Sequence, residues 1–401
     1  MFTYNSPASD FMTIFMAETE KSATTLKHDY SASGSLLCFG FGYNGFSQLA
    51  NNSVADEVHK EIQPSNSVLT PFVLDIGRIH SVVASWSSNF YLKENGLVSV
   101  YGLIPGKKYV GKKENLLPSF IVTDACSSWT MLSFLTKDGE CLLWKNYTIE
   151  KSVPRKVKAM GLKFRAVGCR ETSCILLTDK GQVGSAVCEQ DQDCLDSGKS
   201  EFLFEPMDVK TQISSIACGK EHALLLSSSG DVLSLGGGSR GQLGCGLTVD
   251  EQSPAVVAAL EGIRIQFIAA GGWHSAAISE FGDLYMWGWN EKGQLGLAFN
   301  HGNVDDSQPS SHPVQCQVVP AIVNIPGDLD VLTVSCGTRH TAVVAGDGSV
   351  WTWGWGNYGQ LGHDDRKDKN SPCEVGALSS LKHKPKTVCC GDWSTFVIIS
   401  K

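Results

Sequence analysis

Three histidines stand at equivalent places in the chain and are its first candidates for chemistry. His222, His274 and His340 each lie three residues after one glycine and eight residues before another. Imidazole is a common general base and metal ligand, so a histidine that recurs in this way could belong to a metal triad.

Two glycine-rich motifs could also serve an enzyme. Residues 237–241 read G-x-S-x-G, which would make Ser239 the nucleophile of an α/β-hydrolase. The dinucleotide-binding motif G-x-G-x-x-G begins at Gly40, Gly236 and Gly354. Its chemistry needs a strand, a tight loop and then a helix whose N-terminus faces the pyrophosphate.

The elements that hold these residues belong to one internal repeat. Segments 213–246, 265–297 and 331–365 align so that their key glycines and histidines coincide, and each has two apolar runs separated by a glycine. Runs such as 341–345 are β-branched, which is typical of packed strands. The glycine between the runs, Gly348 for example, allows the positive φ of a tight hairpin turn. The repeat therefore predicts strands, with no helix after the motifs.

A strand-built repeat of roughly 50 residues is the signature of a β-propeller, in which four-stranded blades surround a central channel. The three strong copies are preceded by three weaker ones, at 79–102, 122–145 and 164–184. Together they predict six complete blades.

The chain begins and ends in halves of this repeat. Segment 36–50 is a second half, in which Phe39 is matched to Trp353, and segment 386–400 is a first half. Pairing them gives a seventh blade shared by both ends, which leaves no open sheet edge in the ring. The predicted fold is all-β, a seven-bladed β-propeller over residues 36–401.

The repeat alignment argues against a catalytic role for each of these motifs. Ser239 aligns with Glu291 and Asn357, so its place does not require a hydroxyl. The copies of G-x-G-x-x-G share one place of the repeat and predict turns. Histidines of three adjacent blades lie on an arc and not around one point, and hydroxyl side chains replace them elsewhere, at Ser88, Thr130, Thr172 and Ser394. We therefore predict structural histidines that hydrogen-bond to backbone, no catalytic residue, no metal and no cofactor.

The bulk composition favours a globular protein in a reducing compartment. The chain has 401 residues, 42% of them hydrophobic, and a net charge of −8. No apolar run reaches the 18 or so residues that cross a bilayer, and no basic flank marks a secretory signal. The 14 cysteines include no C-x-x-C pair. The negative charge argues against direct DNA binding, which needs clustered Lys and Arg.

Two segments stand apart from the repeats. Residues 1–35 are polar and without periodicity, which predicts a disordered arm, and Met16 is an alternative start to Met1. Residues 298–319 lengthen one connection between blades and predict a mobile loop insertion.

The order Cys-Gly-x-x-His, Gly-x-Val/Leu and Trp-Gly-x-Asn/Gly-x-x-Gly-Gln-Leu-Gly resembles the regulator of chromosome condensation (RCC) repeat, which builds seven-bladed propellers. The resemblance covers 36–400 and is strongest in the last three complete repeats. Segments 271–295 and 336–365 are similar to family members that partner a Jumonji-C histone lysine demethylase. The resemblance implies a nuclear, chromosome-associated protein, with the cytoplasm as a second location, that acts in chromatin regulation and chromosome segregation.

Tryptophans recur at further places of the repeat. Trp129, Trp273 and Trp393 are matched to one place between the glycine and the histidine, which Arg339 or Glu221 fills in other repeats. A place that accepts such different side chains does not suit a core, and Trp and Arg are enriched at binding hot spots. We therefore predict a partner-binding ring on one face; the alternative is that each Trp caps its own blade. The candidate residues are Trp129, Trp273, Trp289, Arg339, Trp355, Tyr358 and Trp393.

The sequence favours a propeller scaffold without catalysis of its own, monomeric alone, that binds a protein partner. The alternative is a guanine-nucleotide exchange factor for a small GTPase, the activity of the founding member of the resembled family. That member also has a basic N-terminal tail for nucleosomes, whereas the arm here has no arginine.

Overall fold

The structure is a computed structural model that describes residues 37–45, 48–49, 67–74, 76–107, 110–147, 152–188, 202–297 and 315–399. Within these residues the chain forms strands β1 to β28 and two short 3-10 helices. The predicted arm 1–35 and most of the predicted insertion, residues 298–314, lie outside the described residues. No helix of the described part is long and apolar enough to span a membrane.

Each strong repeat forms an antiparallel sheet of four strands in chain order. The first sheet has β15 (Ile213–Cys218), β16 (His222–Ser227), β17 (Val232–Gly236) and β18 (Glu251–Val256). The second has β19 (Ile265–Ala270), β20 (His274–Ser279), β21 (Leu284–Trp289) and β22 (Cys316–Val323). The third has β23 (Val331–Cys336), β24 (His340–Ala345), β25 (Val350–Gly354) and β26 (Lys369–Glu374). The 3-10 helices η2 (Ala258–Leu260) and η3 (Gly376–Leu378) follow β18 and β26.

The weaker repeats form the same pattern. One sheet has β3 (Ile79–Ala84), β4 (Ser88–Lys93), β5 (Val98–Leu103) and β6 (Val110–Lys113). The next four strands are β7 (Val122–Ser127), β8 (Met131–Thr136), β9 (Cys141–Lys145) and β10 (Arg155–Lys158). They are followed by β11 (Phe164–Cys169), β12 (Cys174–Thr178), β13 (Val183–Cys188) and β14 (Phe202–Pro206).

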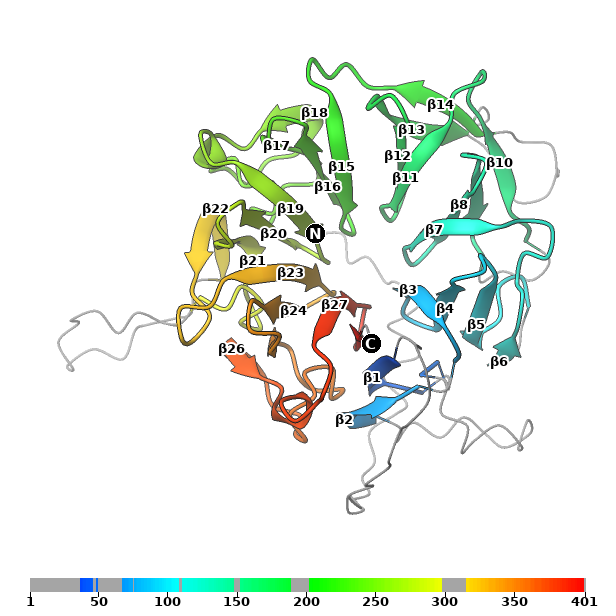
Figure 1. Ribbon diagram of the computed structural model, residues 1–401. Coiled ribbons are helices and arrows are strands. Elements are labelled where there is room, and N and C mark those ends of the chain that lie inside the picture. The colour runs from blue at the N-terminus through cyan, green and yellow to red at the C-terminus, as the bar shows by residue number, and fades with distance from the viewer. Residues whose placement is uncertain are drawn as a thin grey trace, which may run out of the picture.

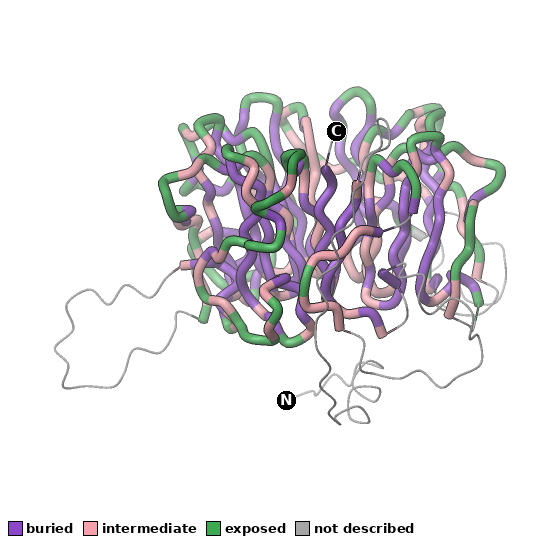
Figure 2. The backbone as a smooth tube through the Cα atoms, turned by 60° about the horizontal axis from the view of Figure 1, so that its bottom comes forward, coloured by how far each residue is buried: buried purple, intermediate pink, exposed green. Residues whose placement is uncertain are grey.

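The sheets stand around a central axis, with the first strand of each repeat nearest to it (Figure 1). These first strands contact one another in chain order, from β3 through β7, β11, β15, β19 and β23 to β27 (Pro385–Cys390), and β27 contacts β3 again. Figure 2 shows the chain buried through the middle of the ring and exposed at its two ends. Apolar side chains between neighbouring sheets form the core, among them the fully buried Trp287 and Trp353.

The prediction of seven separate four-stranded sheets is wrong in one respect. Hydrogen bonds divide the described strands into five four-stranded sheets and one of eight strands, β7 to β14. The outermost strands β10 and β14 pair in parallel through Val157 with Phe202 and Lys158 with Leu203. Two residue pairs at the rim therefore join two consecutive repeats, and a repeat pattern read one copy at a time could not reveal them.

The chain ends close the ring as predicted. β1 (Leu37–Tyr43) pairs antiparallel with β28 (Ser394–Ile399), in a sheet of order β2-β1-β28-β27 that includes β2 (Ser67–Val73). The register differs from the expected one, because Gly42, with φ 116°, lies opposite Ser394, as Gly354 lies opposite His340. Phe41 therefore takes the place of Trp353, and the match of Phe39 to Trp353 is wrong by two residues.

The predicted insertion also ends earlier than expected. Residues 316–319 belong to β22, which pairs with β21 through Cys316 and Trp289. The β-branched pair Val318 and Val319 suits a strand.

Candidate functional site

The turns between first and second strands leave the same end of each sheet as the connections between third and fourth strands. Trp273 lies in such a turn, and Trp289 ends the third strand of the same sheet. The amide of Trp289 donates to the carbonyl of Trp273 over 2.8 Å, and that of Trp355 donates to Arg339 in the same way. We call this end of the ring the turn face.

Two arginines on the turn face lie between three tryptophans. The guanidinium carbon of Arg240 is 4.5 Å from the ring centroid of Trp273 and 5.0 Å from that of Trp289. The guanidinium carbon of Arg339 is 4.7 Å from Trp289 and 5.5 Å from Trp355. Each such cation–π contact contributes about 0.5–2 kcal/mol, depending on how far it is desolvated. The stacking therefore fixes both arginines in place.

Aromatic rings continue the arrangement around the face. The ring centroids of Trp355 and Tyr358 are 5.1 Å apart, and those of Tyr358 and Trp393 are 5.6 Å apart. Tyr43 packs edge-on against both Tyr358 and Trp393. Burial raises the pKa of Tyr43 and Tyr358, so both phenols are neutral at physiological pH. We call the following set the outer row: Arg240, Trp273, Trp289, Arg339, Trp355, Tyr358, Trp393 and Tyr43.

The outer row is half-buried and partly exposed to solvent. Every one of its residues has intermediate exposure, whereas the core tryptophans Trp287 and Trp353 are fully buried. Six of the seven predicted residues lie in this row, and the structure brings them into contact along consecutive sheets. The alternative that each Trp caps only its own blade does not describe Trp289, because Arg339 of the next sheet stacks on it. Whether the row binds a partner stays a prediction.

Trp129 is the exception, since it does not occupy the predicted place. The amide of Ser128 donates to the carbonyl of Met131, as Gly337 does to His340, so Ser128 and Met131 fill the glycine and histidine places. The sequence assignment to Ser127 and Thr130 was wrong by one residue. Trp129 therefore directly follows the glycine place, nearer the axis than Trp273.

A second group lies near the axis and consists of Trp129, Lys220 and Asp392. We call it the inner cluster. Lys220 Nζ lies 3.6 Å from the ring centroid of Trp129 and 5.2 Å from that of Trp273. The same ammonium is 3.5 Å from Asp392 Oδ1, an ion pair too long for a good hydrogen bond. Asp392 also accepts hydrogen bonds from Trp129 Nε1, over 3.2 Å, and from the Thr338 hydroxyl. Burial lowers the pKa of Lys220, which the charge of Asp392 counteracts.

Four residues of these two groups were missed at the level of sequence. Arg240 was detectable, because it shares its repeat place with Lys292 and the predicted Tyr358. Tyr43 was hidden by the two-residue error in the first half-repeat. Lys220 and Asp392 share the place after the glycine, where the residue types vary, and only the ring geometry shows that they meet.

The three histidines link neighbouring sheets. Nε2 of His222 is 2.8 Å from the Ser275 hydroxyl, and Nε2 of His274 is 3.0 Å from the Thr341 hydroxyl. Each hydroxyl donates its single proton to the backbone carbonyl of a glutamine, as Ser275 does to Gln242. The hydroxyl can therefore only accept from the imidazole, which must carry its proton on Nε2. Burial lowers the pKa of His222 and His274 to about 3 and that of His340 to about 4. The histidines are therefore neutral and structural, although they bond to hydroxyls and not directly to backbone as predicted.

The buried thiols for which the pKa is raised are poor nucleophiles. Twelve of the cysteines in the described part are free, and burial raises the pKa of Cys218, Cys336 and Cys390, which leaves these three protonated. Among the described residues, no group of three or more His, Cys, Asp or Glu side chains is placed to hold a metal ion.

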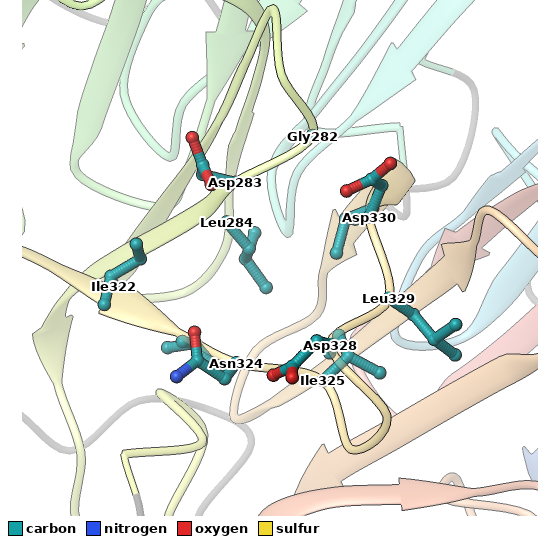
Figure 3. Close-up of a pocket in the computed structure, with 11 residues that line it drawn as sticks. Gly282, Asp283, Leu284, Ile322, Asn324, Ile325, Asp328, Leu329 and Asp330 are labelled. Carbon is teal, nitrogen blue, oxygen red and sulfur yellow. The ribbon is translucent and has the colours of Figure 1, made fainter.

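One hollow of about 140 Å³ lies at the end of the ring opposite the turn face, between the β20–β21 turn and the β22–β23 connection. Asp283, Asp328 and Asp330 line it, but Figure 3 shows their carboxylates on separate sides of the hollow. Asp283 is also held by the hydroxyl of Ser279 over 2.7 Å. The turn face is therefore the better candidate site.

Comparison with known proteins extends over nearly the whole chain. A family model described as the RCC1-like domain matches residues 30–397. Human RCC1 domain-containing protein 1 is 32% identical over 388 residues, which are 90% of this chain and 96% of that protein. Its mouse counterpart is 39% identical over 215 residues, 48% of this chain and 57% of that protein.

Solved structures show the same architecture. Prp20p of Saccharomyces cerevisiae, described together with its binding properties to Gsp1p and histones, matches with a TM-score of 0.74 and 18% identity over 93% of each chain. Human WBSCR16 matches with a TM-score of 0.72 and 17% identity, over 91% of this chain and 100% of that chain. At these identities the likeness shows the fold alone, an all-β propeller.

Proposed function

This chain belongs to the RCC1-like domain family, and from that premise we propose that it is a non-catalytic propeller scaffold whose turn face binds a protein partner. We count the eight-stranded sheet as two blades, because each half repeats the four-strand pattern and its inner strand contacts the next. That count gives seven blades. A ring of packed sheets is a rigid support, on which turn residues can change without disturbing the core.

The observation that carries the proposal is the continuous outer row. Trp, Tyr and Arg are the residue types most enriched at binding hot spots, and here they are held in fixed positions by mutual stacking. A surface ordered before binding loses little side-chain entropy when a partner docks.

The proposed partner is a Jumonji-C histone lysine demethylase, and the proposed location is the nucleus, on chromosomes. Both rest on the resemblance of segments 271–295 and 336–365 to family members with that partner, and agree with the likeness to RCC1 domain-containing protein 1 over 90% of the chain. The role would be to place or control the demethylase in chromatin regulation and chromosome segregation.

A binding experiment tests this proposal. Isothermal titration of the full chain with a purified Jumonji-C demethylase should show a saturable complex, which Trp289→Ala weakens at least tenfold. Phe281→Ala is the matched control, because Phe281 is a 76% exposed aromatic at the opposite end of the same sheet. Equal weakening by both variants, or no complex with the wild type, would count against the proposal.

Guanine-nucleotide exchange on a small GTPase is the second candidate. It is favoured by the fold shared with Prp20p, whose binding to Gsp1p has been described. Measuring the release of labelled GDP from a panel of small GTPases separates the two functions. Strong acceleration by the full chain would favour exchange over the scaffold.

A further inference from the structure

Arg240 and Arg339 carry charges that nothing in the described chain neutralises. Neither guanidinium forms an ion pair or hydrogen bond with another described residue; their contacts are with tryptophan rings. Two carboxylates of the turn face are engaged elsewhere. Asp392 binds Lys220, and Asp368 accepts the amide of Gly356 over 2.9 Å. Two fixed, half-buried cations are therefore left without an anion.

The stacking determines which part of each guanidinium is available. The rings of Trp273 and Trp289 stand at 89° to each other, so the Arg240 guanidinium can lie flat on only one of them and meets the other with its edge or at an angle, while its remaining edge stays available. The N–H donors lie in the guanidinium plane and point outward from its edge, where they match the two oxygens of a carboxylate. A carboxylate arriving at that edge would form a bidentate pair without disturbing the indoles.

The separation of the two arginines has an upper limit. Both guanidinium carbons lie near the same indole, 5.0 Å and 4.7 Å from the Trp289 centroid. Their distance is therefore at most about 10 Å, within the span of two or three residues of extended chain. In an extended segment, side chains two residues apart point to the same side.

We propose that Arg240 and Arg339 bind two carboxylates of an extended acidic segment in the partner protein, of the pattern Asp/Glu-x-Asp/Glu. This inference rests on the proposed function and specifies the partner's chemistry at the outer row. The residue between the two acids packs over Trp289.

The charge of the molecule favours an acidic peptide over a nucleic acid. Nucleic-acid binding draws on many phosphate contacts with Lys and Arg, whereas the outer row has two arginines and the chain a net charge of −8. A carboxylate pair needs only two guanidinium groups at the right spacing. The pairing also gains from partial burial, since charged hydrogen bonds strengthen where water is excluded.

The test is fluorescence anisotropy with the full chain and a fluorescein-labelled 12-residue peptide that contains Glu-Ala-Glu. The matched probes are the same peptide with Gln-Ala-Gln and a labelled 12-base-pair DNA duplex. Arg240→Gln and Arg339→Gln should each weaken binding of the acidic peptide at least tenfold, and the Gln-Ala-Gln peptide should bind at least tenfold more weakly than the acidic one. Lys292→Gln is the matched control, because Lys292 has the same repeat place as Arg240 but lies 3.9 Å from Asp368.

Several outcomes would overturn the inference. These are equal binding of the Gln-Ala-Gln peptide, tighter binding of the DNA, or the same loss in Lys292→Gln as in the arginine variants. A second copy of this chain could instead bind at the outer row, and light scattering tests for that dimer. A concentration-dependent dimer that Arg240→Gln abolishes would also overturn the inference. Thermal melting of each variant verifies folding. If Trp289→Ala weakens the demethylase complex while the arginine variants do not, the scaffold function stands and the acidic-segment inference falls.

Discussion

His340 donates from Nε2 to the hydroxyl of Thr395, 3.0 Å away, across the boundary between two consecutive sheets. The Thr395 hydroxyl in turn donates a hydrogen bond to the backbone carbonyl of Gln360, 2.7 Å away. The Gln360 side chain in turn accepts the amide of Tyr358, a residue of the outer row. This series of hydrogen bonds connects the second strand of one sheet to the turn face. The repeated histidine and the glutamine of the Gly-Gln-Leu-Gly motif therefore belong to one hydrogen-bonded network.

The histidines predict a pH-dependent stability. In the folded chain, burial holds their pKa values at about 3 to 4, far below the value of about 6.5 in an unfolded chain. The unfolded state therefore binds more protons below pH 6.5, and stability falls as the pH drops from there toward 4. Each histidine would cost about 2 kcal/mol by pH 5.

Urea unfolding between pH 7.5 and pH 5 checks this prediction. His340→Gln should be less stable at pH 7.5 but lose less stability between the two pH values than the wild type. An identical pH slope in this variant would contradict the assignment to the histidine.

Removing the hydroxyl of Thr395 should destabilise the ring. Thr395→Val keeps the shape of the side chain but leaves His340 Nε2–H without an acceptor in a fully buried site. Leaving a buried donor unpaired costs about 1–3 kcal/mol. Thr395→Ser is the control, because it keeps the hydroxyl and should stay within about 1 kcal/mol of the wild type in urea unfolding.

The strong repeats made much of the fold predictable. Glycine and histidine spacing identified the hairpins of β15 to β26, and the half-repeats at the two ends predicted the pairing of β1 with β28, which is confirmed. These features are local or repeat at a fixed interval, so one sequence contains enough information to find them.

The errors fall where the repeat has lost its marker residues. Segment 122–145 has no glycine at the first glycine place and no histidine, so its alignment depended on less specific residues, and Trp129 was misplaced by one position. The turn glycine Gly139 was the remaining marker, because it lies eight residues after Met131 and not after Thr130. The contact of Lys220 with Trp129 and Asp392 depends on how turns from distant blades meet near the axis. Such contacts form only when the ring closes, so the residue spacing within one repeat cannot predict them.

Deletion of residues 386–401 should prevent a stable ring. It removes β27 and β28, and with them the buried Phe396 and Val397 that pack on β1. β1 then becomes an exposed edge, which invites aggregation. We expect a much lower melting temperature and aggregates in light scattering. A truncated chain that melts at the wild-type temperature would show that the shared sheet does not hold the ring closed.

A milder variant separates ring closure from loss of chain length. Phe396→Ala should cost about 3–5 kcal/mol, the usual cost of a large truncation in a core. The control is Ile322→Ala on the outer strand β22, which is 51% exposed and should change stability little.

The pair of Lys220 and Asp392 should show unequal costs of removal. In Asp392→Asn, the ammonium remains buried between Trp129 and Trp273 without its counter-charge, which is costly for a side chain only 11% exposed. In Lys220→Met, Asp392 keeps the hydrogen bonds from Trp129 and Thr338. We therefore expect Asp392→Asn to destabilise by about 3 kcal/mol or more, and Lys220→Met by less.

Because the two groups interact directly, the double variant should be more stable than the sum of the two losses predicts, by about 1–3 kcal/mol in urea unfolding. Additive losses would mean that the ion pair contributes no coupling and that the stacking of Lys220 on tryptophan alone holds the inner cluster.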